Sequence, residues 1–303
     1  MITRDPGAFL AQARRCGPDF GPATARAAFL VAPEGFRRAE QSALDNAYMA
    51  EGSSFEAERA LAQHRALHAA LAASCPVLCF PGDPDTPDAV FPNNAFASAP
   101  GRLLVGRMRH PVRQCETARD DIRRFFGEVL GVRTIDLSGQ PHPCELTGSL
   151  VIDRARGLGY CGLSERCDED GARLMHEAFD LRATLVFDLA PGEYHANVVM
   201  SVLAGRCVLL CEDGFASPAV AAAIADLYAP HAIRLSAAER RGFVANCMAL
   251  DADTVWMSAR AGRALDPLHR AALGRAGFAV REVPLDAIEA AGGSLRCCVG
   301  EIF

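Results

Sequence analysis

Two adjacent cysteines near the end of the chain are the first candidates for chemistry. They follow a glycine pair and precede a short apolar run, in the segment Gly292-Gly293-Ser294-Leu295-Arg296-Cys297-Cys298-Val299-Gly300-Glu301-Ile302-Phe303. A cysteine thiolate is a nucleophile, and a Gly-Gly pair lets the backbone take positive φ and approach a ligand closely. The apolar residues predict a strand that anchors the thiols and points Cys297 and Cys298 to opposite faces. Because buried cysteine is also a common core residue, a reaction requires partners elsewhere in the chain.

Polar residues at the ends of apolar runs are the candidate partners. His195 could act as the base for a thiol, whose ordinary pKa is about 8.5. Glu145 could orient this histidine or hold a cationic substrate. Asp88 and Asn94 flank another apolar run. Each residue also has a structural interpretation: a satisfied core histidine, a solvated turn carboxylate, or an amide that caps its own turn.

The elements that must position these residues form a repeated unit. Each unit has an apolar segment, a turn, a second apolar segment, a helix and a strand, and the units span residues 94–137, 149–187, 197–235 and 247–283, with a fifth split between 27–31 and 295–303. Helices are predicted at residues 54–73, 116–130, 168–179, 218–228 and 267–276. Such units should pack around a common axis, where their inner ends converge on one cavity. The alternative is an ordinary mixed α/β sheet in which the repeats are accidental.

Four motifs, in this order, resemble those of the guanidine-modifying hydrolases and amidinotransferases of the pentein superfamily. They are Phe91-Pro92-Asn93-Asn94, Glu145-Leu146-Thr147-Gly148-Ser149, Tyr194-His195-Ala196-Asn197 and Gly292-Gly293-Ser294-Leu295-Arg296-Cys297. The segments 41–48 and 300–303 are similar to the branch of citrulline utilisation hydrolases. The resemblance implies an α/β fold, a five-bladed α/β propeller with pseudo-fivefold repeats. It also implies a single catalytic domain over residues 26–303, preceded by an N-terminal extension over residues 1–25.

The resemblance also implies roles for single residues, and it implies no metal and no cofactor. Cys297 matches the nucleophile, His195 the general acid/base and Glu145 a carboxylate that holds the substrate. The matches for substrate binding are Asp88, Asn94, Arg166 and Arg113, of which the two arginines match groups that bind the amino-acid carboxylate.

Three departures from the family pattern bear on the substrate. Arginine deiminases and dimethylargininases carry an aspartate at Asn94 and another at Gly148, so this chain lacks two negative charges there. An asparagine amide both donates and accepts, and can therefore hold a neutral ureido group as well as a guanidinium. Leu146 stands where close relatives usually have glycine, and we expect it to narrow the pocket.

These residues predict a cysteine hydrolase that converts citrulline to ornithine, ammonia and carbon dioxide through a covalent intermediate on Cys297. Alternatives on the same scaffold are arginine dihydrolysis, an arginine deiminase or dimethylargininase activity, and, less favoured, amidino transfer. A non-catalytic pentein module that binds a ribosome or another partner is disfavoured, because it would need no pairing of His195 with Cys297.

Composition restricts the partners and the compartment. The 303 residues carry a formal net charge of −6 with mixed signs, which favours a small-molecule ureido or guanidino amino acid over nucleic acid or a membrane surface. Twelve cysteines without a Cys-x-x-Cys pair predict reduced thiols, and no segment resembles a signal peptide or membrane span, so a cytoplasmic protein is expected. The sequence is compatible with a homodimer.

Two further patterns could bind metals, but each has a simpler interpretation. His64 and His68 are spaced for zinc, but a solvated helix face is favoured because a third ligand is not evident. Asp83, Asp85 and Asp88 indicate a loop before the active-site strand rather than a calcium site.

Overall fold

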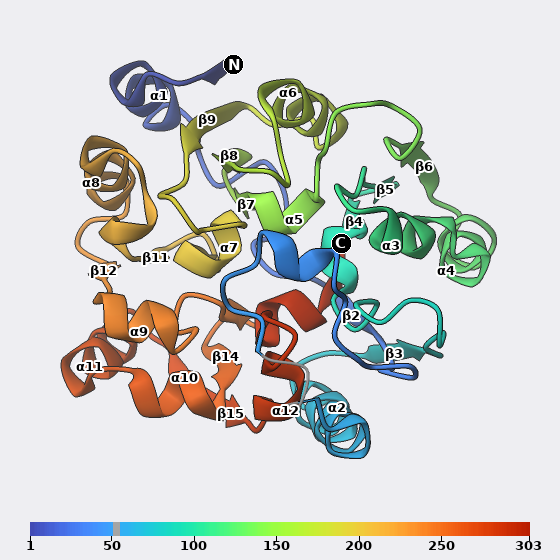
Figure 1. Ribbon diagram of the computed structural model, residues 1–303. Coiled ribbons are helices and arrows are strands. Elements are labelled where there is room, and N and C mark those ends of the chain that lie inside the picture. The colour runs from blue at the N-terminus through green and yellow to red at the C-terminus, as the bar shows by residue number, and fades with distance from the viewer. Residues whose placement is uncertain (51–54) are drawn as a thin grey trace.

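The computed structural model describes residues 1–50 and 55–303, and its strands form five small sheets. Figure 1 shows these sheets around a central region that contains α5 (Leu146–Ser149) and α7 (Ala196–Val199), with helices such as α2 (Ala57–Leu71), α6 (Glu169–Ala178), α8 (Pro218–Leu227) and α11 (Pro267–Arg275) on the outside. The sheets comprise β16 (Gly300–Ile302), β2 (Ala27–Val31) and β3 (Val77–Phe80); β4 (Phe96–Ala99), β5 (Arg102–Val105) and β6 (Arg133–Asp136); β1 (Ile2–Thr3), β9 (Ala183–Asp188), β8 (Leu158–Leu163) and β7 (Leu150–Asp153); β10 (Met200–Leu203), β11 (Cys207–Leu210) and β12 (Ala232–Arg234); and β13 (Met248–Ala249), β14 (Thr254–Ser258) and β15 (Ala279–Val283).

Every sheet contains the same pairing of strands. Two strands form an antiparallel pair, and a third strand runs parallel to the second after a crossover. The hairpin between β10 and β11 turns through the three residues between Leu203 and Cys207, of which Ala204 and Gly205 have positive φ. The repeated unit predicted from the sequence is therefore confirmed, including the split unit in which β16 pairs with β2. The fold is mixed α/β, and its closure into a five-bladed propeller stays a prediction.

The longer helices lie between the second and third strands of the units. They include α2 (Ala57–Leu71), α6 (Glu169–Ala178), α8 (Pro218–Leu227) and α11 (Pro267–Arg275). The others are α1 (Pro6–Ala13), α3 (Pro111–Gln114), α4 (Asp120–Arg124), α9 (Ala237–Arg241), α10 (Ala259–Ala264) and α12 (Asp286–Glu289), with short 3-10 or π turns at η1 (Ser42–Leu44), η4 (Cys115–Ala118), η5 (Phe125–Val129) and η6 (Glu212–Gly214). The start predicted for α2, residue 54, lies outside the described residues.

Two predictions about helices are wrong. The single helix predicted over residues 116–130 is instead the broken series η4, α4 and η5, whose interruption at Arg119 has extended backbone. His64 does not lie on a solvated face of α2, because it is 2% exposed and burial lowers its pKa to about 4. It faces the core between α2 and its sheet, together with Leu67 and Leu71.

Residues 1–25 pack onto the sheet formed by β1, β9, β8 and β7. β1 adds a parallel strand beside β9, and α1 contacts both β9 and α8. Phe9 of α1 is fully buried and meets the ring of Tyr160 edge to face, with centroids 5.6 Å apart. These residues therefore share the core of that sheet.

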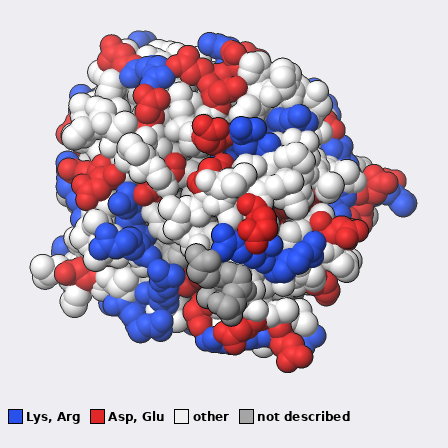
Figure 2. Space-filling view, viewed as in Figure 1, with Lys and Arg blue, Asp and Glu red and all other residues white. Residues whose placement is uncertain are grey.

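The surface and the helices show two further general features. On the face shown in Figure 2, acidic and basic side chains are interspersed, and every basic one is arginine because the chain has no lysine. Among the helices of residues 1–50 and 55–303, none has the length and apolar character needed to span a membrane.

Candidate active site

Short helical turns just before the first strands of the units carry most of the predicted site residues. These turns are η3 (Pro92–Asn94), α5 (Leu146–Ser149), α7 (Ala196–Val199) and η7 (Leu295–Cys298), which precede β4, β7, β10 and β16. In space, η3 contacts α5 and η7, and α5 contacts α7. The remaining unit reaches this group through Asn246, two residues before β13. The structure thus brings the four distant motifs together in one central layer.

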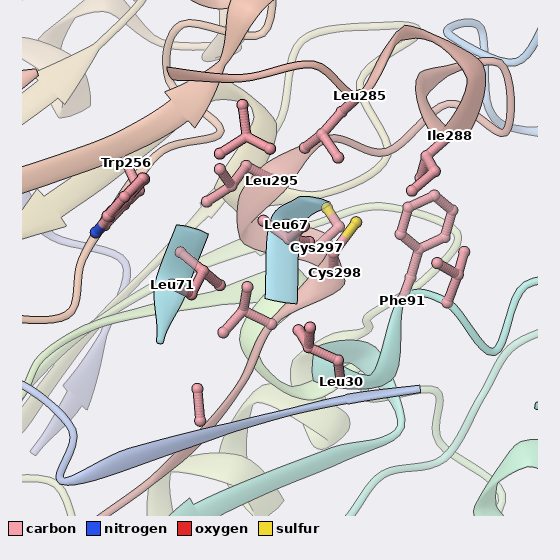
Figure 3. Packing of buried hydrophobic residues seen from close by; sticks show 14 of the residues in the cluster. Leu30, Leu67, Leu71, Phe91, Trp256, Leu285, Ile288, Leu295, Cys297 and Cys298 are labelled. Atoms are coloured by element: carbon pink, nitrogen blue, oxygen red, sulfur yellow. The ribbon is translucent and has the colours of Figure 1, made fainter. Parts of the chain in front are cut away.

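Cys297 lies in η7, so the predicted strand at the two thiols is wrong. The strand begins only at Gly300, and alternation along a strand does not explain which thiol faces the pocket. Cys297 lines the candidate pocket, whereas Cys298 is fully buried in the apolar cluster around Leu295 and Ile288. Figure 3 shows both thiols within this cluster. The glycine pair permits a tight turn, because Gly292 has φ +79° and a Cβ on Gly293 would lie 2.8 Å from the ring of Phe91.

The sulfur of Cys297 contacts two asparagine side chains. Asn246 Nδ2 donates to Sγ at 3.2 Å, and Asn197 Oδ1 can accept from the thiol at 3.8 Å. The predicted partner, His195, makes no hydrogen bond to this sulfur in the structure. Burial raises the pKa of the Cys297 thiol, and the bond from Asn246 opposes that rise.

His195 instead forms a buried pair with Glu145. Its Nε2 lies 2.9 Å from Glu145 Oε2, and both side chains are essentially inaccessible to solvent. Because an ionised carboxylate only accepts hydrogen bonds, Nε2 carries the hydrogen, and in the neutral ring Nδ1 keeps a lone pair. Nδ1 has no protein partner. Burial lowers the pKa of His195, so the ring is neutral near pH 7 and can act as a base.

Two buried arginines surround Glu145. Arg166 lies with Nη1 at 3.2 Å from Glu145 Oε2, and Arg113 Nη1 lies 3.8 Å from the same oxygen. Burial alone would raise the pKa of Glu145, but the charge of Arg166 and the hydrogen bond from His195 outweigh it and hold the pKa well below its usual range. Glu145 is therefore a carboxylate at neutral pH.

Each of these arginines is also bonded to a second carboxylate that the sequence did not single out. Arg166 donates through Nε and Nη2 to Asp45, at 2.9 and 2.6 Å. Arg113 donates in the same two-pronged way to Glu116, at 2.9 and 2.8 Å. Such forks are strong, so a substrate carboxylate would have to share or displace these partners.

The pocket beside Cys297 is lined by residues with unpaired polar groups. Asp88 Oδ2 accepts from Ser42 Oγ at 2.6 Å, but the buried Oδ1 has no partner. Asn94 Oδ1 accepts from Arg113 Nη1 at 3.0 Å, but Nδ2 has no partner. Burial raises the pKa of Asp88. A ligand that both donates and accepts would satisfy the two free groups.

Gly148 gives Asn94 and His195 room to approach each other. A Cβ on Gly148 would lie 2.9 Å from His195 Nδ1 and would overlap Asn94 Nδ2. The expectation that Leu146 narrows the pocket is wrong. Leu146 has a positive φ of 25° and turns into the core with Cys144 and Leu150 rather than lining the pocket.

Asn246 is the main site residue that sequence reasoning missed, although a signal was present. An aromatic residue followed three positions later by asparagine occurs at Phe91, Tyr194 and Phe243, and it ends at Asn94, Asn197 and Asn246. All five asparagines of the chain are buried at or beside this central layer: Asn46, Asn93, Asn94, Asn197 and Asn246. Asp45 lies in segment 41–48, which resembles the family, but its bond to Arg166, a residue 121 positions away, could not be read from the sequence.

No group of three metal-ligating side chains occurs within residues 1–50 and 55–303. His64 is buried in the core, and His68 Nε2 faces the Val77 carbonyl oxygen at 3.3 Å. Asp83 accepts from the backbone of Asp85 at 2.8 Å, as in a turn. The Asp83 contact fits the predicted loop, whereas the burial of His64 fits neither a zinc site with His68 nor the predicted solvated face.

The fold and a family match together define the class of protein. The chain belongs to the pentein superfamily of guanidino-modifying hydrolases, and its fold is similar to solved members. The N-terminal domain of ArgZ, an arginine dihydrolase from the ornithine–ammonia cycle in cyanobacteria, bound to product, has a TM-score of 0.80 at 22% identity, over 91% of this chain and 97% of that one. Unliganded AgrE has a TM-score of 0.80 at 22% identity, over 91% of this chain but 39% of that one.

A dimethylarginine dimethylaminohydrolase variant, as an adduct with S-methyl-L-thiocitrulline, has a TM-score of 0.69 at 19% identity, over 92% of this chain and 100% of that one. A search of curated proteins finds no match to the sequence. The family model for N,N dimethylarginine dimethylhydrolase, eukaryotic, matches residues 32–303. The chain belongs to this family, and it is a hydrolase acting on guanidino-type C–N bonds.

Proposed function

We propose that this enzyme hydrolyses the ureido group of citrulline to give ornithine, ammonia and carbon dioxide, with Cys297 as the nucleophile. His195 serves as general acid and base, and Glu145 holds the histidine. Asp88 and Asn94 bind the ureido group, and Arg166 and Arg113 provide positive charge for the amino-acid carboxylate.

The orientation of Asn94 carries this proposal. Its Oδ1 accepts from Arg113, and a guanidinium has no acceptor, so turning the amide over would set two donors against each other. Asn94 therefore offers the pocket its Nδ2 donor, which needs an acceptor on the ligand. A ureido carbonyl oxygen is such an acceptor, whereas a guanidinium ion has only N–H groups. The free Oδ1 of Asp88 can accept from the ureido NH₂.

The chemistry follows from these positions. The Cys297 thiol passes its proton to His195 Nδ1, the resulting thiolate forms a bond to the ureido carbon, one C–N bond breaks, and the departing nitrogen takes this proton from His195. Water, deprotonated by His195, then attacks the same carbon and releases the sulfur as thiolate. The resulting carbamate breaks down to an amine and carbon dioxide, so that citrulline and one water give ornithine, ammonia and carbon dioxide.

Product analysis tests the proposal. Purified enzyme is incubated with citrulline or arginine, and ornithine, citrulline and ammonia are measured. We expect ornithine from citrulline, and turnover at least about 10³-fold lower in C297S, since removing a catalytic nucleophile leaves only the remaining site. The matched control is C298A, which changes the adjacent buried thiol and should keep most of the activity. Full turnover in C297S would exclude the assigned nucleophile, and stable citrulline would exclude the substrate.

A second candidate, arginine hydrolysis, is favoured by the free oxygen of Asp88. A buried carboxylate that faces the pocket is also a good partner for the N–H groups of a guanidinium. Ornithine formed from arginine would identify a dihydrolase, whereas citrulline accumulation would identify a deiminase or dimethylargininase-type reaction. Transfer to added glycine or ornithine would identify an amidinotransferase.

The predicted architecture is part of this proposal. We propose that the five sheets close around the central turns as a five-bladed propeller, with residues 26–303 as one catalytic domain. The same strand pairing in every sheet and the contacts among η3, α5, α7 and η7 support it.

A further inference from the structure

We infer that Asn246 is a catalytic residue, whose side-chain amide donates a hydrogen bond to the Cys297 thiolate and keeps it reactive. The inference rests on the proposed role of Cys297 as nucleophile. Asn246 is completely buried and comes from the one unit that contributes no other site residue. It contacts both the sulfur and the backbone of Cys297.

The orientation of the Asn246 amide is determined by its own bonds. Oδ1 accepts from the Cys297 backbone N–H at 3.4 Å, and Nδ2 donates to the Asn197 carbonyl oxygen at 2.9 Å. If the amide were reversed, its NH₂ would face the Cys297 backbone N–H and its oxygen would face the Asn197 carbonyl oxygen, so neither hydrogen bond could form. Nδ2 must therefore be the atom near the sulfur. Of its two hydrogens, one serves Asn197 and the other can point to Sγ at 3.2 Å.

The two asparagines suit the two forms of the sulfur. The neutral thiol can donate to Asn197 Oδ1 at 3.8 Å, whereas the thiolate can only accept and has Asn246 Nδ2 as its donor. A hydrogen bond to an anion is stronger than one to a neutral acceptor. Asn246 therefore stabilises the thiolate relative to the thiol, in a site where burial favours the thiol.

Other charged or titratable groups near the sulfur make no bond to it. Arg296 donates to Glu301 and to the Val299 carbonyl oxygen, and Arg113 is bonded to Glu116. Burial and the charge of a Cys297 thiolate raise the pKa values of Tyr194 and Cys298, so both groups stay neutral near pH 7, and Tyr194 donates to the Gly292 carbonyl oxygen. Asn246 is accordingly the side-chain donor to Sγ, and a backbone hydrogen bond from Ser294 also lowers the pKa of the Cys297 thiol.

A purely structural role would make a different prediction. Asn246 also links α7 to η7 through Asn197 and Cys297, and a structural residue would only hold these two elements together. Loss of such a residue lowers stability and activity at every pH. Loss of a thiolate donor also moves the pH at which Cys297 ionises.

The experiment measures the alkylation rate of Cys297 by iodoacetamide as a function of pH, with the modified peptide quantified by mass spectrometry. In N246A the midpoint should rise by about one pH unit, which corresponds to about tenfold slower alkylation below the midpoint. In N246D, a carboxylate replaces the donor and should raise the midpoint further. The alkaline rise of kcat/KM should shift with the midpoint.

The matched control is N93D, which adds the same carboxylate to the same layer of turns. The Asn93 side chain has no bond to Cys297, so this variant should shift the midpoint less than N246D does. If the alkylation midpoint of Cys297 is unchanged in folded N246A and N246D, whatever their melting temperatures, Asn246 has only a structural role. Full turnover in C297S would instead contradict the proposed nucleophile, without altering the alkylation result.

Discussion

At the scale of single residues, the site is a network of buried ionic groups whose partners are shared. Glu145 receives a hydrogen bond from His195 and lies beside Arg166, and Arg166 is held in turn by Asp45. Removing one member of such a network leaves a buried charge without its partner, which costs more than the bond itself contributed. The geometry of His195 is therefore tied to residues that touch no substrate.

The substitution E145Q tests this dependence through pH. The pKa of Glu145 is lowered in the folded protein, so its ionised form contributes stability above the ordinary carboxyl pKa of 4.5, and this contribution is lost as pH falls through the lower folded value. We expect E145Q to lose about 3–5 kcal/mol at pH 7. The difference in melting temperature between the wild type and E145Q should shrink as pH falls below about 4. A constant difference from pH 7 to pH 3 would contradict this account.

At the scale of elements, the repeated units could be predicted from the sequence and the turns before them could not. Alternating apolar segments and hairpin signals are local, and with helical periodicity they placed α6, α8 and α11 within one residue at each end. The turns α7 and η7 are only four residues long, so periodicity does not distinguish them from the start of a strand. Contacts such as Asp45 with Arg166 depend on the assembled layer and leave no local pattern.

The close approach permitted by Gly148 can be tested at this scale. G148A places a methyl group 2.9 Å from His195 Nδ1 and against the Asn94 amide, so both side chains must move. We expect kcat/KM to fall by about 100-fold, the effect of displacing a catalytic group by about 1 Å. G139A is the matched control, since a Cβ there meets nothing within 4 Å. Equal activity in the two variants would show that His195 and Asn94 can shift without loss of catalysis.

At the scale of the whole molecule, residues before the family match are part of the core. The family model begins at residue 32, yet β1 extends the sheet of β9, β8 and β7, and α1 packs against β9 and against α8 of the neighbouring unit. The sequence offered no interpretation of residues 1–25, because their apolar side chains find partners only in the assembled core between these units. The segment therefore contributes to stability rather than to the central site.

The substitution F9A measures this contribution. Truncating a fully buried phenylalanine should cost about 3–5 kcal/mol of unfolding free energy. The control L268A changes a side chain that is 76% exposed and should cost less than about 0.5 kcal/mol. Chemical denaturation of both variants checks the difference. A wild-type midpoint for F9A would mean that α1 is detached from the cooperative fold.

The five buried asparagines have a spectroscopic consequence. Because the chain has no asparagine outside the central layer and its edge, protein labelled with ¹⁵N only at asparagine would give backbone signals from just five positions, all at or near the site. Their side-chain NH₂ signals would add direct reporters of the pocket, including the unpartnered Nδ2 of Asn94 and the donor of Asn246. A small spectrum of an otherwise unlabelled 303-residue protein would then register ligand binding, thiol ionisation and formation of the covalent intermediate as separate shifts.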